Sequence, residues 1–297
     1  MLELKNITKY FNSNLVLDNI SFTVPKGEIF GLIGPNGAGK TTTLRIILGI
    51  LTLSDGKIFF NNNLLNQNYS NITGYLPEER GLYPKSNVIN TLAYLGQLKG
   101  LKYSEVIEKI NYWLNRLDML EYSKYHIEEL SKGNQQKVQF ISAILHDPKI
   151  LILDEPFSGF DPVNQSIFRE IIEEYKQDKF IILSTHLMDL AESLCDEIFL
   201  IDRGKEIFSG KMKNIINSEE RTSYEVSFLE NLNEEQFDSI KMFNPVRKSK
   251  NSVYLKNSIK NPTEIIKELS RNFEITEFKK NVPSLNQIFL SLVDKSS

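Results

Sequence analysis

Residues 34–41 read GPNGAGKT and place three glycines and one lysine within eight positions. The apolar run IFGLI at 29–33 precedes this segment, and TTLRIIL at 42–48 follows it with the character of a helix. Glycine adopts backbone angles that other residues avoid, so the segment predicts a tight loop. A strand, a tight glycine loop and a helix in succession are elements of a parallel α/β sheet, which restricts the chain to few folds.

The same segment matches the P-loop pattern G-x-x-x-x-G-K-[ST]. Successive backbone N–H groups and the positive end of the following helix form an anion site. We expect Lys40 to reach the β- and γ-phosphates of a nucleoside triphosphate, Thr41 to bind Mg²⁺ and Thr42 to contact the α-phosphate. The residues expected around the phosphates are Gly34, Pro35, Asn36, Gly37, Ala38, Gly39, Lys40, Thr41 and Thr42.

The alternative for this segment is a glycine-rich turn that binds nothing. The strand pattern before it and the helix pattern after it argue against that alternative, because they supply the context that the motif requires. The pattern by itself does not separate ATPases, GTPases and kinases.

Composition narrows the class of protein. The chain has 297 residues, of which 41% are hydrophobic, and this suits one large domain or two ordinary ones. The net charge is −3 and no cluster of Lys or Arg stands out, which argues against a nucleic-acid partner. Cys195 is the only cysteine, so no intrachain disulfide is possible. No run of 18 apolar residues occurs, so the sequence predicts no membrane span.

Strand and helix patterns alternate along most of the chain. Residues 1–30 alternate in the manner of strands, and residues 87–146 have the apolar spacing of helices. The run KILIL at 149–153 suits a strand buried on both faces of a parallel sheet. These patterns predict an α/β domain over residues 1–215, with a helical subdomain at about 87–146. Residues 61–71 are rich in asparagine and are expected to form a surface loop.

Polarity rises after Gly210, and we expect a domain boundary near residue 215. The tail over 216–297 reads strand, helix, two short strands, helix, strand and a last helix. The order βαββαβ is that of a small ferredoxin-like α+β unit.

Two acidic residues, Asp154 and Glu155, come directly after the apolar run at 149–153. Ligands of parallel α/β sheets bind at the carboxyl ends of the strands, where the P-loop also lies. We therefore expect Asp154 to hold Mg²⁺ and Glu155 to act as general base on the attacking water. The alternative is a pair of solvated acids in a loop.

The chain has three histidines, and His186 follows the strand-like run FIILST at 180–185. At that sheet edge His186 could donate a hydrogen bond to the γ-phosphate, although a lone histidine is more often structural. His126 and His146 are expected to be structural. The three are too scattered along the chain to indicate a metal site.

Together these motifs resemble the ATP-binding subunit of an ABC transporter over about residues 1–215. Its motifs occur here in order as GPNGAGKT at 34–41, LSKGNQQK at 130–137, LDEP at 153–156, SGFD at 158–161 and His186. The forms GYLPEERGLYP at 74–84 and PSLNQIFLSLV at 283–293 resemble the ATPases of bacterial ABC-2-type exporters, a group that includes sodium and drug exporters.

The resemblance implies a fold with a parallel-sheet core, an antiparallel β subdomain and a helical subdomain. It also implies that two subunits sandwich two ATP molecules. The signature residues Ser131, Gly133 and Asn134 would then face the γ-phosphate held by the other copy, and Asp161 would link the two sites. His186 would fix the γ-phosphate and water, and Phe11, with Tyr10 as second choice, would stack on adenine.

Two positions depart from the usual family pattern. Glu78 stands where a glutamine is usual, and adjacent Glu79 leaves that alignment open by one residue. A carboxylate can bind Mg²⁺ or orient water but cannot donate as an amide does, so we expect Glu78 to serve in metal binding and catalysis. The signature has Lys132 and Asn134 instead of glycine and glutamine; Lys132 either attracts ATP or points to solvent.

The expected function is therefore that of an ATPase that powers a membrane exporter. The implied partners are an integral membrane permease, docked near residues 78–100, and a second ATP-binding subunit, a copy of this chain rather than a different one. The expected location is the cytoplasmic face of the membrane.

The alternatives are a soluble ABC ATPase acting on ribosomes or DNA, and a catalytically idle regulatory subunit. The single cassette and the lack of basic clusters argue against an ATPase that acts on ribosomes or DNA. The idle subunit is opposed by the intact set of expected site residues, namely Lys40, Asp154, Glu155 and His186.

Overall fold

A computed structural model describes residues 1–65, 69–79, 81–216, 223–256 and 261–293 of the chain. The chain divides into two compact units, Met1–Gly210 and Lys211–Ser297. The boundary predicted near residue 215 lies in helix α7 (Met212–Ile216), close to this division.

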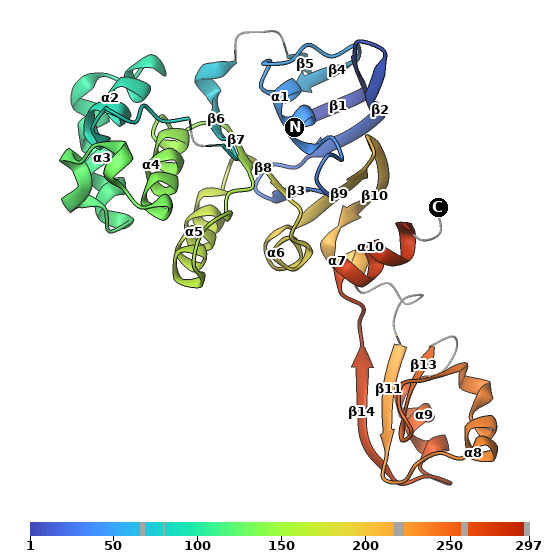
Figure 1. The fold of residues 1–297 in the computed structure, drawn as a ribbon. Coiled ribbons are helices and arrows are strands. Elements are labelled where there is room, and N and C mark those ends of the chain that lie inside the picture. The colour runs from blue at the N-terminus through green and yellow to red at the C-terminus, as the bar shows by residue number, and fades with distance from the viewer. Residues whose placement is uncertain (66–68, 80, 217–222, 257–260, 294–297) are drawn as a thin grey trace. The chain divides into compact units, whose positions relative to one another are not determined.

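A six-stranded sheet forms the centre of the first unit, in the order β10-β9-β3-β8-β7-β6 (Figure 1). The pairs β9–β3, β3–β8, β8–β7 and β7–β6 are all parallel, as the alternation of strands and helices predicts. Strands β3, β7 and β8 are buried along their whole length, because helices and the second sheet cover a parallel sheet on both faces. The strands are β3 (Ile29–Ile33), β6 (Thr73–Leu76), β7 (Ile150–Asp154), β8 (Phe180–Thr185), β9 (Glu197–Asp202) and β10 (Lys205–Lys211).

A second sheet of antiparallel strands has the order β2-β1-β4-β5. Its strands are β1 (Leu2–Phe11), β2 (Asn14–Val24), β4 (Asp55–Phe60) and β5 (Asn63–Leu64). The two sheets share one core: Phe22 of β2 stacks on Phe30 of β3 with ring centroids 5.0 Å apart, and Phe199 of β9 lies 4.9 Å from Phe22. This shared core makes the antiparallel sheet part of the same unit.

The expectation of a plain surface loop at 61–71 is wrong in part. Asn61 and Asn62 have positive φ angles of 49° and 66° and join β4 to β5 as a two-residue turn, in which Phe60 pairs with Asn63. Asparagine tolerates the left-handed conformation that tight hairpin turns require. A 3₁₀ helix, η1 (Ser70–Ile72), closes the segment, and residues 66–68 lie outside the described part.

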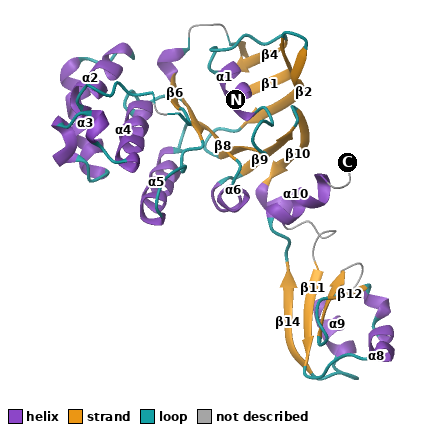
Figure 2. Cartoon of the chain, viewed as in Figure 1, coloured by secondary structure: helices purple, strands orange, loops and turns teal. Residues whose placement is uncertain are grey.

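Helices cover the central sheet and form the helical subdomain (Figure 2). Three of them begin at side chains that accept a backbone N–H, namely Asn87, Ser131 and Asp161, as N-caps do. The helical pattern predicted over 87–146 becomes α2, α3 and α4. The helices are α1 (Lys40–Ile47), α2 (Val88–Leu98), α3 (Tyr103–Arg116), α4 (Lys132–Ile144), α5 (Pro162–Tyr175) and α6 (Met188–Leu194), with 3₁₀ turns η2 (Leu120–Lys124) and η3 (Ile127–Glu129).

The second unit contains an antiparallel sheet in the order β12-β13-β11-β14. With the chain order βαββαβ, this strand order is that of the ferredoxin-like fold, and the prediction is confirmed. Its core combines alternate residues of β11 and β13 with apolar residues of the helices. The elements are β11 (Ser223–Phe228), α8 (Glu234–Ser239), η5 (Lys241–Phe243), β12 (Pro245–Arg247), β13 (Ser252–Lys256), α9 (Pro262–Leu269), β14 (Ile275–Asn281) and α10 (Leu285–Val293).

Across the described residues, every helix is too short or too polar to cross a bilayer.

His146 lies between the end of α4 and the start of β6, where its Nε2 donates to the carbonyl of Thr73 at 3.1 Å. Its Nδ1 is buried without a partner among the described residues. Burial, followed by the nearby charge of Lys99, lowers the pKa of His146 to about 4. The folded state therefore favours the neutral ring.

We predict that lowering the pH from 6.5 to 4.5 destabilises the native protein through His146, because the unfolded chain then binds a proton that the folded chain does not. The loss is about 1–2 kcal/mol after allowance for partial solvent screening. The His146→Gln variant retains a donor for Thr73 and does not titrate, so its stability should fall less over this range. Urea unfolding followed by the fluorescence of Trp113, the only tryptophan, measures the difference. Parallel pH profiles for the two proteins would contradict the assignment.

Candidate active site

The glycine-rich loop joins the end of β3 to the start of α1. Gly37 and Gly39 have φ angles of 79° and 110°, which other residues rarely adopt. A Cβ atom on Gly34 would lie 2.1 Å from the carbonyl oxygen of Ile201 on β9. The loop therefore requires glycine at position 34 for a close approach to the sheet, and at positions 37 and 39 for their backbone angles.

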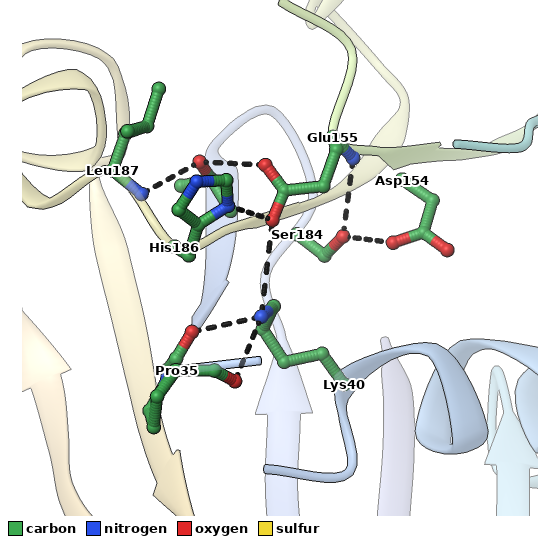
Figure 3. Close-up of polar contacts among 9 residues, drawn as sticks. Pro35, Lys40, Asp154, Glu155, Ser184, His186 and Leu187 are labelled. Carbon is green, nitrogen blue, oxygen red and sulfur yellow. Dashed lines mark hydrogen bonds and ion pairs between the residues drawn. The ribbon is translucent and has the colours of Figure 1, made fainter. Parts of the chain in front are cut away.

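Lys40 is the first residue of α1, and only 7% of it is exposed. Its Nζ donates to the carbonyls of Gly34 at 2.8 Å and Pro35 at 3.2 Å, and it lies 3.8 Å from Oε1 of Glu155 (Figure 3). Burial lowers the pKa of Lys40, and the negative charges of Glu155, Asp154 and Glu78 oppose this shift. The loop carbonyls and the carboxylate together hold a buried ammonium at the mouth of the loop.

Asp154 ends strand β7 and lies opposite Ser184 of β8 in the register of the two strands. The Ser184 hydroxyl donates to Oδ1 of Asp154 (Figure 3). The other oxygen, Oδ2, is buried and has no partner in the part of the chain that the structure describes. A buried carboxylate oxygen without a donor favours a cation, and Thr41 and Glu78 supply further oxygens around the same pocket. The donor set therefore fits Mg²⁺.

Glu155 follows with a left-handed backbone, at φ 49°, and its N–H bonds the carbonyl and hydroxyl of Ser184. Its carboxylate accepts from the Thr185 hydroxyl at Oε2, 3.2 Å away, and contacts Nδ1 of His186 at Oε1, 2.8 Å away. The carboxylate is thus held from β8 on one side and lies close to Lys40 on the other (Figure 3).

These groups meet around a pocket of about 260 Å³. The sequence-predicted residues that line it are Asn36, Gly37, Gly39, Lys40, Thr41, Thr42, Glu78, Asp154 and Glu155. His186 reaches the pocket through its contact with Glu155. Gly34, Pro35 and Ala38 shape the loop without being among the lining residues.

The predicted adenine-stacking residue is not among those that line this pocket. Phe11 is exposed, and the Lys9 ammonium lies 4.9 Å from the centroid of the Phe11 ring. The stacking of Phe11 on adenine therefore stays a prediction. Val16, for which the sequence carries no signal of a site, lines the pocket. Its place in the alternating pattern of β2 gave no sign of a site.

Ser131, Gly133 and Asn134 are also absent from the lining of this pocket. Ser131 caps helix α4 by accepting the N–H of Asn134 at 3.2 Å. Gly133 lies in the first turn of α4, beside the ring of Phe160. Their role toward a second subunit stays a prediction, as does docking near residues 78–100, of which Arg80 lies outside the described part.

A phosphate-binding glycine loop after β3, a lysine at the start of α1 and acidic residues at the end of β7 define a P-loop nucleotide-binding protein. Strand β8 lies between β3 and β7 in the sheet. The loop after β3, His186 after β8 and the acids at the end of β7 therefore lie together at the carboxyl ends of these strands. Two family models match the chain: ABC transporter over residues 17–158, and the C-terminal domain of DrrA1-3-like ATP-binding proteins over 210–293.

The ABC transporter ATP-binding protein YhaQ of Bacillus subtilis is 46% identical over 219 residues, 73% of this chain and 74% of the relative. The Nod factor export ATP-binding protein I of Cupriavidus metallidurans is 33% identical over 223 residues, 74% of each chain. A solved ATP-binding subunit of an ABC transporter superposes with a TM-score of 0.68 at 31% identity, covering 72% of this chain and 91% of that one. The chain belongs to the ABC transporter ATP-binding proteins, and it binds and hydrolyses ATP.

Proposed function

We propose that this chain is the ATPase of an exporter, in which two copies close on ATP and reopen after hydrolysis. The name of the Nod factor export relative supports this direction of transport. The partners in this proposal are an integral membrane permease and a second copy of the chain, held at the cytoplasmic face of the membrane.

Within one copy, the loop amides and Lys40 bind the β- and γ-phosphates. Thr41, Asp154 and Glu78 would hold Mg²⁺, which when bound neutralises charge that develops on the phosphate oxygens. Glu155 acts as general base on the water that attacks the γ-phosphorus, and His186 contacts the γ-phosphate and orients Glu155. The observation that carries this assignment is the carboxylate of Glu155, which is held by Thr185 and His186 at the edge of a pocket lined by Lys40.

The second copy completes each site. The hydroxyl of Ser131, the amide of Gly133 and the side chain of Asn134 would approach the γ-phosphate bound by the other P-loop. Ser131 and Gly133 lie at the N-terminus of α4, a 13-residue helix whose dipole favours an anion there. Because these residues do not line the pocket of their own chain, one copy alone offers an incomplete site in this proposal.

We predict that Lys40→Ala weakens ATP binding by tenfold or more, because it removes the buried ammonium that faces the phosphates. Isothermal titration calorimetry measures the change. Lys26→Ala is the matched control, because the Lys26 side chain is 52% exposed and pairs only with surface Asp178 among the described residues. Equal affinity in Lys40→Ala and the native protein would contradict the role of the loop.

We predict that Glu155→Gln retains ATP binding and lowers turnover by about a hundredfold or more, because an amide cannot accept a proton from water. The trapped ATP should hold two copies together, so light scattering should report a dimer in ATP. Glu173→Gln, on the exposed face of α5, is the control. Rapid phosphate release by Glu155→Gln would exclude Glu155 as general base.

We predict that Ser131→Ala weakens the ATP-dependent dimer of the slowly hydrolysing Glu155→Gln background while leaving ATP affinity of the monomer unchanged. The loss of a helix cap costs about 1 kcal/mol and could disturb α4. Ser131→Asn keeps a capping oxygen and should show the same dimer defect. Sedimentation velocity measures dimerisation, and equal loss of monomer binding would contradict a site shared between copies.

A further inference from the structure

Two consecutive hydroxyl residues, Ser184 and Thr185, end strand β8 and are fully buried. The Ser184 hydroxyl donates to Asp154, which ends β7, and the Thr185 hydroxyl donates to Glu155, which follows Asp154. Resting on the proposed function, we infer that they are positioning residues with separate tasks: Ser184 prepares Asp154 for the metal ion, and Thr185 prepares Glu155 for water activation.

The contacts of Ser184 determine which oxygen of Asp154 is free. The Ser184 hydroxyl donates a hydrogen bond to Oδ1 of Asp154, and its oxygen accepts a hydrogen bond from the N–H of Glu155 at 3.3 Å. Asp154 as a whole residue is only 1% exposed, so water does not compete for this bond. Oδ2 is left buried without a partner in the described residues, which suits it to a cation.

The contacts of Thr185 fix the orientation of Glu155 in the same manner. The N–H of Leu187 donates to the Thr185 hydroxyl at 3.1 Å, and the hydroxyl donates to Oε2 of Glu155 at 3.2 Å. Oε1 then faces the nucleotide pocket beside His186 and Lys40 (Figure 3). Thr185 thus holds Oε2 of Glu155, while Oε1, which contacts Nδ1 of His186, is the oxygen on the pocket side.

The register of β7 and β8 explains why two adjacent hydroxyls can serve two adjacent acids. Asp154 lies opposite Ser184 at the end of the ladder, and the residues that follow them, Glu155 and Thr185, also meet. Each hydroxyl contacts a different carboxylate, so the two pairs predict effects that can be separated experimentally.

For Ser184, calorimetry with a non-hydrolysable ATP analogue compares binding in EDTA with binding in saturating Mg²⁺. Ser184→Ala should bind the Mg²⁺ complex about tenfold more weakly, as expected when a residue that orients a metal ligand is lost. Its affinity in EDTA should stay within about twofold of the native value. Ser184→Cys, which is slightly larger and donates only weakly, should behave likewise. Ser193→Ala in α6 is the control.

For Thr185, steady-state kinetics separates binding from chemistry. Thr185→Val should lower kcat about tenfold while KM and both calorimetric affinities stay near native values. Thr185→Ser keeps the hydroxyl and should restore kcat. Thr73→Val removes another buried hydroxyl bond, the one from Thr73 to the carbonyl of Tyr69, and is the matched control.

The outcomes separate this inference from the proposed function. A native protein that fails to bind the analogue or to hydrolyse ATP would overturn the proposed function. A native protein that does both, while Ser184→Ala loses affinity equally with and without Mg²⁺, or Thr185→Val loses kcat without rescue by serine, would overturn the positioning roles alone. Melting temperatures within a few degrees of native confirm that each variant folds.

Discussion

The parallel register of β3, β8 and β7 is the constraint on which the site depends. Ile33 lies opposite Thr185, and Asp154 lies opposite Ser184, so all three strands end at one level. The N–H of Gly34 continues this alignment with a bond of 3.4 Å to the carbonyl of Thr185. A slip of one residue in either ladder would change which residues meet at this level and separate the acids from the loop.

The register also concentrates charge. Glu78, Asp154 and Glu155 line the same pocket as Lys40, so carboxylates outnumber the ammonium around it. An anionic triphosphate would meet repulsion from these carboxylates, and a divalent cation held by Asp154 would offset it. The hydrogen bonds from Ser184 and Thr185 keep the two acids apart in function, because each fixes a different carboxylate in place.

Much of this arrangement could be predicted from the sequence, because its signals are local. The spacing of Gly34, Gly39 and Lys40 defines a loop, and the position of Asp154 after a continuous apolar run places it at a sheet edge. The hydroxyl partners were missed, because they depend on the pairing of β7 with β8, which are joined through a helix and set only by tertiary packing. The hairpin at Asn61-Asn62 was missed because a two-residue strand such as β5 carries no periodicity.

The segment after Glu155 connects this site to the N-terminal end of α4. The side chain of Gln136, buried in α4, donates to the carbonyl of Pro156 at 3.4 Å. Phe160 packs on Phe168 of α5 with centroids 4.4 Å apart, and its ring lies next to Gly133. Because a packed interior transmits displacement, we expect a shift of the segment after Glu155 to displace the first turn of α4. The acid that faces the pocket and the helix end that bears Ser131 are therefore parts of one packed unit within a single subunit.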